Sequence, residues 1–215
     1  MSQTLLHGYF RSSAAFRVRI ALNLKKLSYD QAFRHLRKGE QRAPDFLKLA
    51  PQGLVPALEI DGNTLTQSLA IIEYLEETRP EPALLPKDAA GRARARALAY
   101  ALAMEIHPIN NLRVLQDLEK RFGADAIAVK GWFQHWVKET FGAIETSLAS
   151  SKGTGVFCHG DTPGIADICL VPQVVNNTRF DVDMAPYPTI GRIYKACLEL
   201  PAFADAMPTK QPDAE

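Results

Sequence analysis

The chain has 215 residues, of which 47% are hydrophobic, so it can bury a substantial core in one large or two small domains. Its 25 Lys and Arg residues nearly balance 24 Asp and Glu, and this small net charge argues against nucleic acid or an anionic membrane as a partner. No apolar run approaches the ~18 residues that a membrane span needs. The three cysteines, Cys158, Cys169 and Cys197, are too few and too widely spaced for a disulfide framework or a metal site. We therefore expect a cytoplasmic protein with no secretion signal and no bound metal.

The first third of the chain alternates strands with helices. The helix after the first strand has apolar residues at helical spacing, and Asp61-Gly62 is a two-residue hairpin signal. We expect a strand, helix, strand, short helix, two strands and a helix, at residues 4–9, 13–26, 28–35, 44–49, 57–60, 63–66 and 69–78. This βαβαββα order predicts a parallel βαβ unit that belongs to a small mixed sheet flanked by helices.

The rest of the chain reads as helical. Three prolines within residues 79–86 indicate a linker. Helices are expected at 88–120 with an interruption by Pro108 near His107, and at 124–150, 165–175, 188–198 and 202–206, before a loose tail at 207–215. We therefore expect an α/β domain at 1–83, a linker at 84–90 and an all-helical domain at 91–215.

Arg11, Ser12 and Ser13 lie where the first strand turns into the first helix. The N-terminus of a helix presents unpaired N–H groups and a partial positive charge, which suit an anion. Serine is also a preferred capping residue, so these hydroxyls have a structural interpretation as well as a catalytic one. Position in the sequence does not separate the two.

Several segments resemble cytosolic glutathione transferases, and in particular their zeta class. The matching segments are 9–13 (Tyr-Phe-Arg-Ser-Ser) with 17–22, 54–58 (Leu-Val-Pro-Ala-Leu), 67–68 (Gln-Ser), 106–114 and 176–188. The resemblance covers nearly the whole chain. It implies a thioredoxin-like N-terminal domain followed by an all-α C-terminal domain, reduced glutathione as the cofactor, and a homodimer.

Two positions depart from the family pattern. Ala14 stands where zeta-class enzymes usually have cysteine, so a thiol at this turn must come from glutathione. Gly164 stands where the superfamily usually has the Ser or Thr that caps the central helix, with Asp167 three residues on. Glycine still serves as an N-cap, without the side-chain hydrogen bond.

The resemblance implies a cis–trans isomerase that acts on maleylacetoacetate or maleylpyruvate in the breakdown of aromatic compounds. A thiolate adds to the activated alkene, the resulting single bond rotates, and elimination returns the thiol. A hydroxyl donor favours the thiolate, and Ser12 is the first candidate and Ser13 the second, with Ser13 also a candidate cap. Arg11 and Arg179 would hold the substrate carboxylates. A surface salt bridge to Asp181 or Asp183 is the alternative for Arg179.

Glutathione itself would be held by residues of both domains. The resemblance implies Gln52, Val55, Pro56, Gln67, Ser68 and His107. The Val55 backbone would pair with the cysteinyl unit like an added strand, and the 67–68 pair would hold the γ-glutamyl end. An ordinary turn proline, a helix cap and a structural histidine are the respective alternatives.

Two other functions remain compatible with the sequence. A glutathione transferase could conjugate or dehalogenate small electrophiles such as α-haloacids. A non-catalytic binding module on the same fold is disfavoured, because the hydroxyls, the proline loop and the Gln67-Ser68 pair are all present.

Overall fold

A computed structural model describes residues 4–215 of the chain. The chain forms two compact units, one made of the residues up to Leu84 together with Glu199–Glu215, the other of Leu85–Leu198. The structure therefore groups the last 17 residues, Glu199–Glu215, with the first unit, whereas the sequence analysis assigned them to the helical domain.

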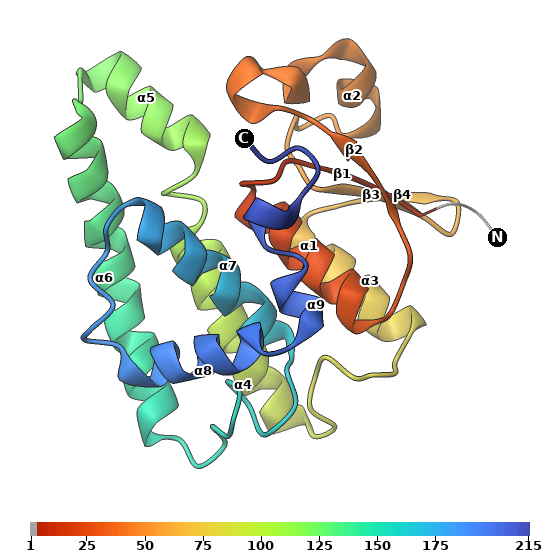
Figure 1. Ribbon diagram of the computed structural model, residues 1–215, viewed down its shortest axis with the longest axis vertical. Coiled ribbons are helices and arrows are strands. Elements are labelled where there is room, and N and C mark those ends of the chain that lie inside the picture. The colour runs from red at the N-terminus through yellow and green to blue at the C-terminus, as the bar shows by residue number, and fades with distance from the viewer. Residues whose placement is uncertain (1–3) are drawn as a thin grey trace. The chain divides into compact units, whose positions relative to one another are not determined.

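The first unit is built on a four-stranded mixed sheet with the order β2-β1-β3-β4 (Figure 1). β1 pairs in parallel with β2, as expected for a βαβ unit, and antiparallel with β3. The hairpin between β3 and β4 turns at Asp61 and Gly62, both with positive φ. The strands are Leu5–Gly8 (β1), Asp30–Phe33 (β2), Ala57–Ile60 (β3) and Asn63–Thr66 (β4).

Helices cover both faces of this sheet. In Figure 1, α1 and α3 lie on one side of the strands and α2 on the other. The helices of this unit are α1 (Ser13–Leu24), α2 (Pro44–Leu49), α3 (Ser68–Thr78) and the short α9 (Pro201–Ala204), which packs against α1. α1 is buried almost all round, and complete burial of Phe16, Ile20 or Leu22 contributes about 1.5–3 kcal/mol each.

The C-terminal segment, expected to be a loose tail, is instead ordered against the first unit. A 3-10 turn forms at Pro208–Lys210, and Gln211 is buried with its amide donating to the carbonyls of Asp205 and Met207. The Phe10 N–H also donates to Asp213, and the Gln31 amide donates to Gln211. The prediction of a loose tail was wrong because these distant partners leave no local pattern in the sequence.

The second unit consists of five helices. α4 and α5 are separated by a π-helical turn at Ala101–Ile106 and by Pro108, so the expected interruption near His107 is confirmed. α7 packs against both α4 and α8, and α6 packs against α8. The helices are Ala89–Tyr100 (α4), Leu112–Phe122 (α5), Ala126–Ser150 (α6), Ile165–Arg179 (α7) and Pro188–Leu198 (α8).

The central helix α7 is longer than expected. The sequence predicts its end at residue 175, where polar residues replace apolar ones, but it continues to Arg179. Asn177 is fully buried and accepts a 2.8 Å hydrogen bond from the Gln173 side chain, so a satisfied polar pair extends the core. At its start, the buried Asp167 carboxylate accepts from the N–H groups of Gly164 and Cys158.

Within residues 4–215, the structure contains no helix with the length and apolar character needed to cross a membrane.

Candidate functional site

Ser12 is the N-cap of α1. Its backbone is extended, its N–H donates to Tyr9 O at 2.9 Å, and its Oγ accepts the Ala15 N–H at 3.1 Å. A hydroxyl has one proton to donate besides its lone pairs, so capping leaves the Ser12 O–H available to a ligand. The capping and catalytic interpretations are therefore compatible at this residue. Ser13 is the first helical residue, so its interpretation as a candidate cap was wrong.

The first turn of α1 retains unpaired donors. Among the described residues, no group accepts the N–H of Ser13 or Ala14. Two such N–H groups at a helix N-terminus carry part of the positive end of the helix dipole. They and the Ser12 hydroxyl form a local environment that stabilises a negative charge.

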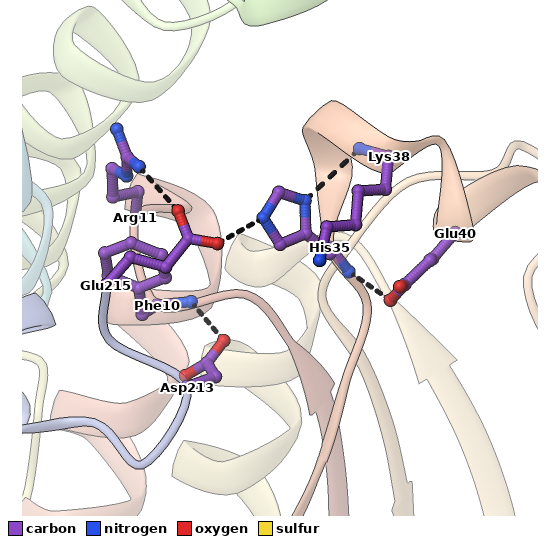
Figure 2. A network of polar contacts seen from close by, with 7 residues as sticks. All are labelled: Phe10, Arg11, His35, Lys38, Glu40, Asp213 and Glu215. Carbon is purple, nitrogen blue, oxygen red and sulfur yellow. Dashed lines mark hydrogen bonds and ion pairs between the residues drawn. The ribbon is translucent and has the colours of Figure 1, made fainter.

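Arg11 directly precedes this cap. Its guanidinium lies 4.8 Å from the centroid of the Phe10 ring, and its Nη2 donates to Glu215 at 3.2 Å (Figure 2). Its buried Nε has no hydrogen-bond partner in the described part of the chain. Arg11 is therefore a cation with unused donor capacity, one residue from the capping hydroxyl.

The second part of the site is the loop before β3. The Val55–Pro56 peptide bond is cis, and the Val55 side chain packs on a small core of Phe46, Ala50 and Ala57. Within residues 4–215, the Val55 backbone N–H and C=O form no hydrogen bond. The loop thus offers one donor and one acceptor of the kind that pairs with an extended peptide.

Gln52 and Gln67 come together although 15 residues separate them. The Gln67 amide donates to Gln52 Oε1 at 2.9 Å. Gln67 has a φ of 66°, a left-handed conformation that costs a non-glycine residue about 1–3 kcal/mol. Gln67 is the N-cap residue of α3, but its side chain makes no capping hydrogen bond, and the buried Ser68 is the first helical residue.

Gly53 allows this loop to adopt its shape. It has a φ of 61°, and a Cβ there would lie 2.9 Å from Gln41 O and 2.8 Å from the guanidinium of Arg42. That guanidinium donates to Gln52 O. The close approach fixes the backbone beside Gln52.

The two remaining predicted residues, His107 and Arg179, belong to the second unit. His107 follows the π-helical turn, is half-buried, and donates its backbone N–H to Leu102 O. Arg179 is the last residue of α7 and donates to the Asn176 side chain at 3.0 Å. Asp181, one of its proposed alternative partners, pairs with Lys130 at 2.7 Å.

The protein's own thiols are unsuited to chemistry. Cys158, Cys169 and Cys197 are all buried, form no disulfide, and lie in the second unit. Burial raises the pKa of Cys158 and of Cys197 well above the usual thiol value, with the Asp167 carboxylate adding to the effect. None of these cysteines is therefore suited to form an accessible thiolate.

Sequence reasoning missed three residues beside the Ser12 loop. Asp213 accepts the Phe10 N–H, and Glu215 bridges Arg11 and His35 (Figure 2). His35 Nδ1 accepts the Lys38 N–H, so Nε2 carries the proton that is donated to Glu215. The His35 hydrogen bond, more than the Arg11 charge, holds the pKa of Glu215 below its usual value. Contacts across 180 or more residues leave no local pattern that could have revealed them.

Comparison with known proteins shows which family the chain resembles. Residues 2–77 match the family described as glutathione S-transferase, N-terminal domain. The maleylacetoacetate isomerase of Rhizobium meliloti is 48% identical, covering 97% of this chain and 98% of its own. A zeta-class maleylpyruvate isomerase of known structure is 49% identical, with a TM-score of 0.97 over 98% of this chain and 100% of its own. A Methylobacterium maleylacetoacetate isomerase solved with malonate and glutathione is 45% identical, with a TM-score of 0.95 over 98% and 99%. The chain therefore belongs to the glutathione S-transferase family, within its zeta class of maleylacetoacetate and maleylpyruvate isomerases.

Proposed function

We propose that this protein is a glutathione-dependent cis–trans isomerase of maleylacetoacetate or maleylpyruvate. The observation that carries the proposal is the start of α1, where the Ser12 hydroxyl lies beside the unpaired N–H groups of the next two residues. The buried cysteines support it, because the chain supplies no accessible thiolate of its own. Relatives at 45–49% identity that carry these two activities by name support the choice of reaction.

The residues of the first unit fit glutathione. The unpaired backbone of Val55, before the cis Pro56, would take the cysteinyl backbone as an added strand. Gln67 and Ser68, with Gln52 bonded to Gln67, would hold the γ-glutamyl end at the N-terminus of α3. His107 would reach the glycyl end, and this assignment rests on the family resemblance.

Bound glutathione supplies a thiolate that adds reversibly to an activated alkene, so that rotation about the former double bond no longer has a high barrier. The Ser12 hydroxyl donates a hydrogen bond to the sulfur and stabilises its ionised form. The N–H groups of Ser13 and Ala14 add the field of the helix N-terminus. Because Ala14 replaces a thiol at this turn, no protein sulfur competes for the alkene.

The substrates proposed are dianions at neutral pH, so each needs cations on its two acidic ends. Arg11, with an unpartnered Nε next to the cap, would hold one carboxylate. Arg179, at the end of α7, would hold the other, as the family resemblance implies. Either guanidinium would also stabilise charge that develops on the substrate oxygen. The malonate in a 45%-identical relative supports a dicarboxylate ligand.

The proposal extends to assembly and location. We propose a homodimer on the strength of the family resemblance, and a cytoplasmic location, supported by three buried cysteines that form no disulfide. Light scattering on the purified protein should give about twice the 23.8 kDa chain mass. A mass of one chain would contradict the dimer.

The test is turnover with defined thiols. The protein is incubated with maleylpyruvate or maleylacetoacetate and with reduced glutathione, S-methylglutathione or neither, while alkene geometry and total thiol are followed. The proposal is supported if isomerisation occurs with reduced glutathione but not with S-methylglutathione or without thiol, and if total thiol stays constant. Consumption of thiol without isomerisation would indicate a transferase or dehalogenase. If the protein neither turns over these substrates nor is retained on immobilised glutathione, it would instead be a binding module without glutathione chemistry.

A further inference from the structure

Both peptide groups that flank Phe10 are held by side chains from outside the turn. The Phe10 N–H donates to Asp213 Oδ2 at 2.9 Å, and the Phe10 carbonyl accepts from Arg19 Nη2 at 3.1 Å. Figure 2 shows the Asp213 carboxylate directed at the Phe10 nitrogen, beneath Arg11 and Glu215. The residue just before Arg11 is therefore clamped on both sides.

Arg19 ties the same clamp to the C-terminal segment. Arg19 is 1% exposed, and its guanidinium also donates to Ala206 O at 3.0 Å. Burial lowers the pKa of Arg19 to about 10, so it is charged at neutral pH, and the nearby Tyr29 and Asp213 partly offset the burial. Asp213 thus has two separable properties: it accepts the Phe10 N–H, and it supplies negative charge near a buried cation.

We propose that Asp213 is a positioning residue for catalysis, which holds the loop of Arg11 and Ser12 through the Phe10 N–H. This inference rests on the proposed function, because it assigns Ser12 and Arg11 their roles. Arg11 and Ser12 follow Phe10 directly, so the direction of the Phe10 peptide sets where both side chains begin. A displacement of about 1 Å in such a group can cost on the order of 100-fold in rate.

The hydrogen bond and the charge predict different outcomes for two substitutions. Asp213→Ala removes the acceptor and the charge, whereas Asp213→Asn retains an acceptor oxygen for the Phe10 N–H. In the Asn variant the amide would occupy the position of Asp213 Oδ1, which is buried without a partner in the described chain, and the counter-charge is lost. We therefore expect both variants to lower Tm, but the Ala variant alone to release the loop.

The test compares full-length Asp213→Ala, Asp213→Asn and the control Asp205→Ala, which removes an exposed carboxylate that pairs with Lys210 in the same segment. Amide hydrogen exchange at Phe10 reports the loop without any substrate. The pKa of bound glutathione, followed by thiolate absorbance, reports its alignment with Ser12. Steady-state kinetics then separate kcat from KM.

In Asp213→Ala we expect protection of the Phe10 amide and kcat each to fall about 10-fold, with a raised thiol pKa. In Asp213→Asn, the protection of the Phe10 amide and kcat should remain within about 3-fold of the parent, and the thiol pKa should stay close to the parent value. Asp205→Ala should match the parent in all of these measurements. Equal losses in the Ala and Asn variants would overturn positioning through the hydrogen bond, as would an Ala variant with normal exchange and normal kcat. A parent protein without isomerase activity would defeat the proposed function, while the exchange and thiol measurements would still decide the role of Asp213.

Discussion

The Ser12 hydroxyl caps α1 and is proposed to donate to the thiolate, and two substitutions separate these roles. Ser12→Ala removes both functions. Ser12→Gly also removes the hydroxyl, but glycine is a tolerable N-cap residue. Ser13→Ala serves as the control, because Ser13 begins the helix without capping it.

The expected magnitudes follow from the geometry. Loss of the 3.1 Å bond between Ser12 Oγ and the Ala15 N–H should cost about 1 kcal/mol in the Ala variant and a few tenths in the Gly variant. For a chain of this size, 1 kcal/mol lowers Tm by about 2–4 °C. A hydrogen bond to a charged group contributes about 1.5–3 kcal/mol, so its loss should raise the bound thiol pKa by about 1–2 units in both variants.

Thermal unfolding measures how much the N-cap contributes to stability, and thiolate absorbance against pH measures how much the donated hydrogen bond lowers the thiol pKa. We expect unequal Tm values but equal rises in thiol pKa for the two Ser12 variants, with kcat/KM at pH 7 down about 10- to 100-fold in both. Undiminished turnover in Ser12→Ala, or a larger effect of Ser13→Ala on the thiol, would refute the assignment of the donor to Ser12.

Three further predictions test the substrate cations and the central helix. Arg179→Leu should raise KM about 10-fold or more with a smaller effect on kcat, and an unchanged KM would remove Arg179 from the substrate site. Glu215→Gln should lower KM for the dianionic substrate several-fold, because the Glu215 carboxylate holds Arg11 at 3.2 Å; steady-state kinetics would contradict this if KM rose or stayed constant. Gly164→Ser should raise Tm by about 2–4 °C by adding a side-chain cap opposite Asp167 and by restricting the unfolded chain, and a fall in Tm in calorimetry would count against the capping assignment.

Local patterns predicted the fold because they matched the period of each element. The hairpin at Asp61 and Gly62, the helix after Ser12 and the break at Pro108 all formed as expected. The end of α7 was misjudged, since a buried amide pair can prolong a helix where apolar spacing stops.

The site was predicted to different extents. Ser12 was recognisable from its place between a strand and a helix, whereas the Pro56 loop and the Gln67-Ser68 pair were identified through the family resemblance. The contact between Gln67 and Gln52, and the C-terminal residues beside the Ser12 loop, depend on tertiary packing between distant parts of the chain. No sequence period encodes such contacts.

The most direct test of the central claim is isomerisation with glutathione far below the substrate concentration. If the thiolate adds and leaves again, each glutathione molecule supports many turnovers and total free thiol stays constant to the end of the reaction. Conversion that stops after one equivalent of glutathione, with a matching loss of thiol, would contradict the account.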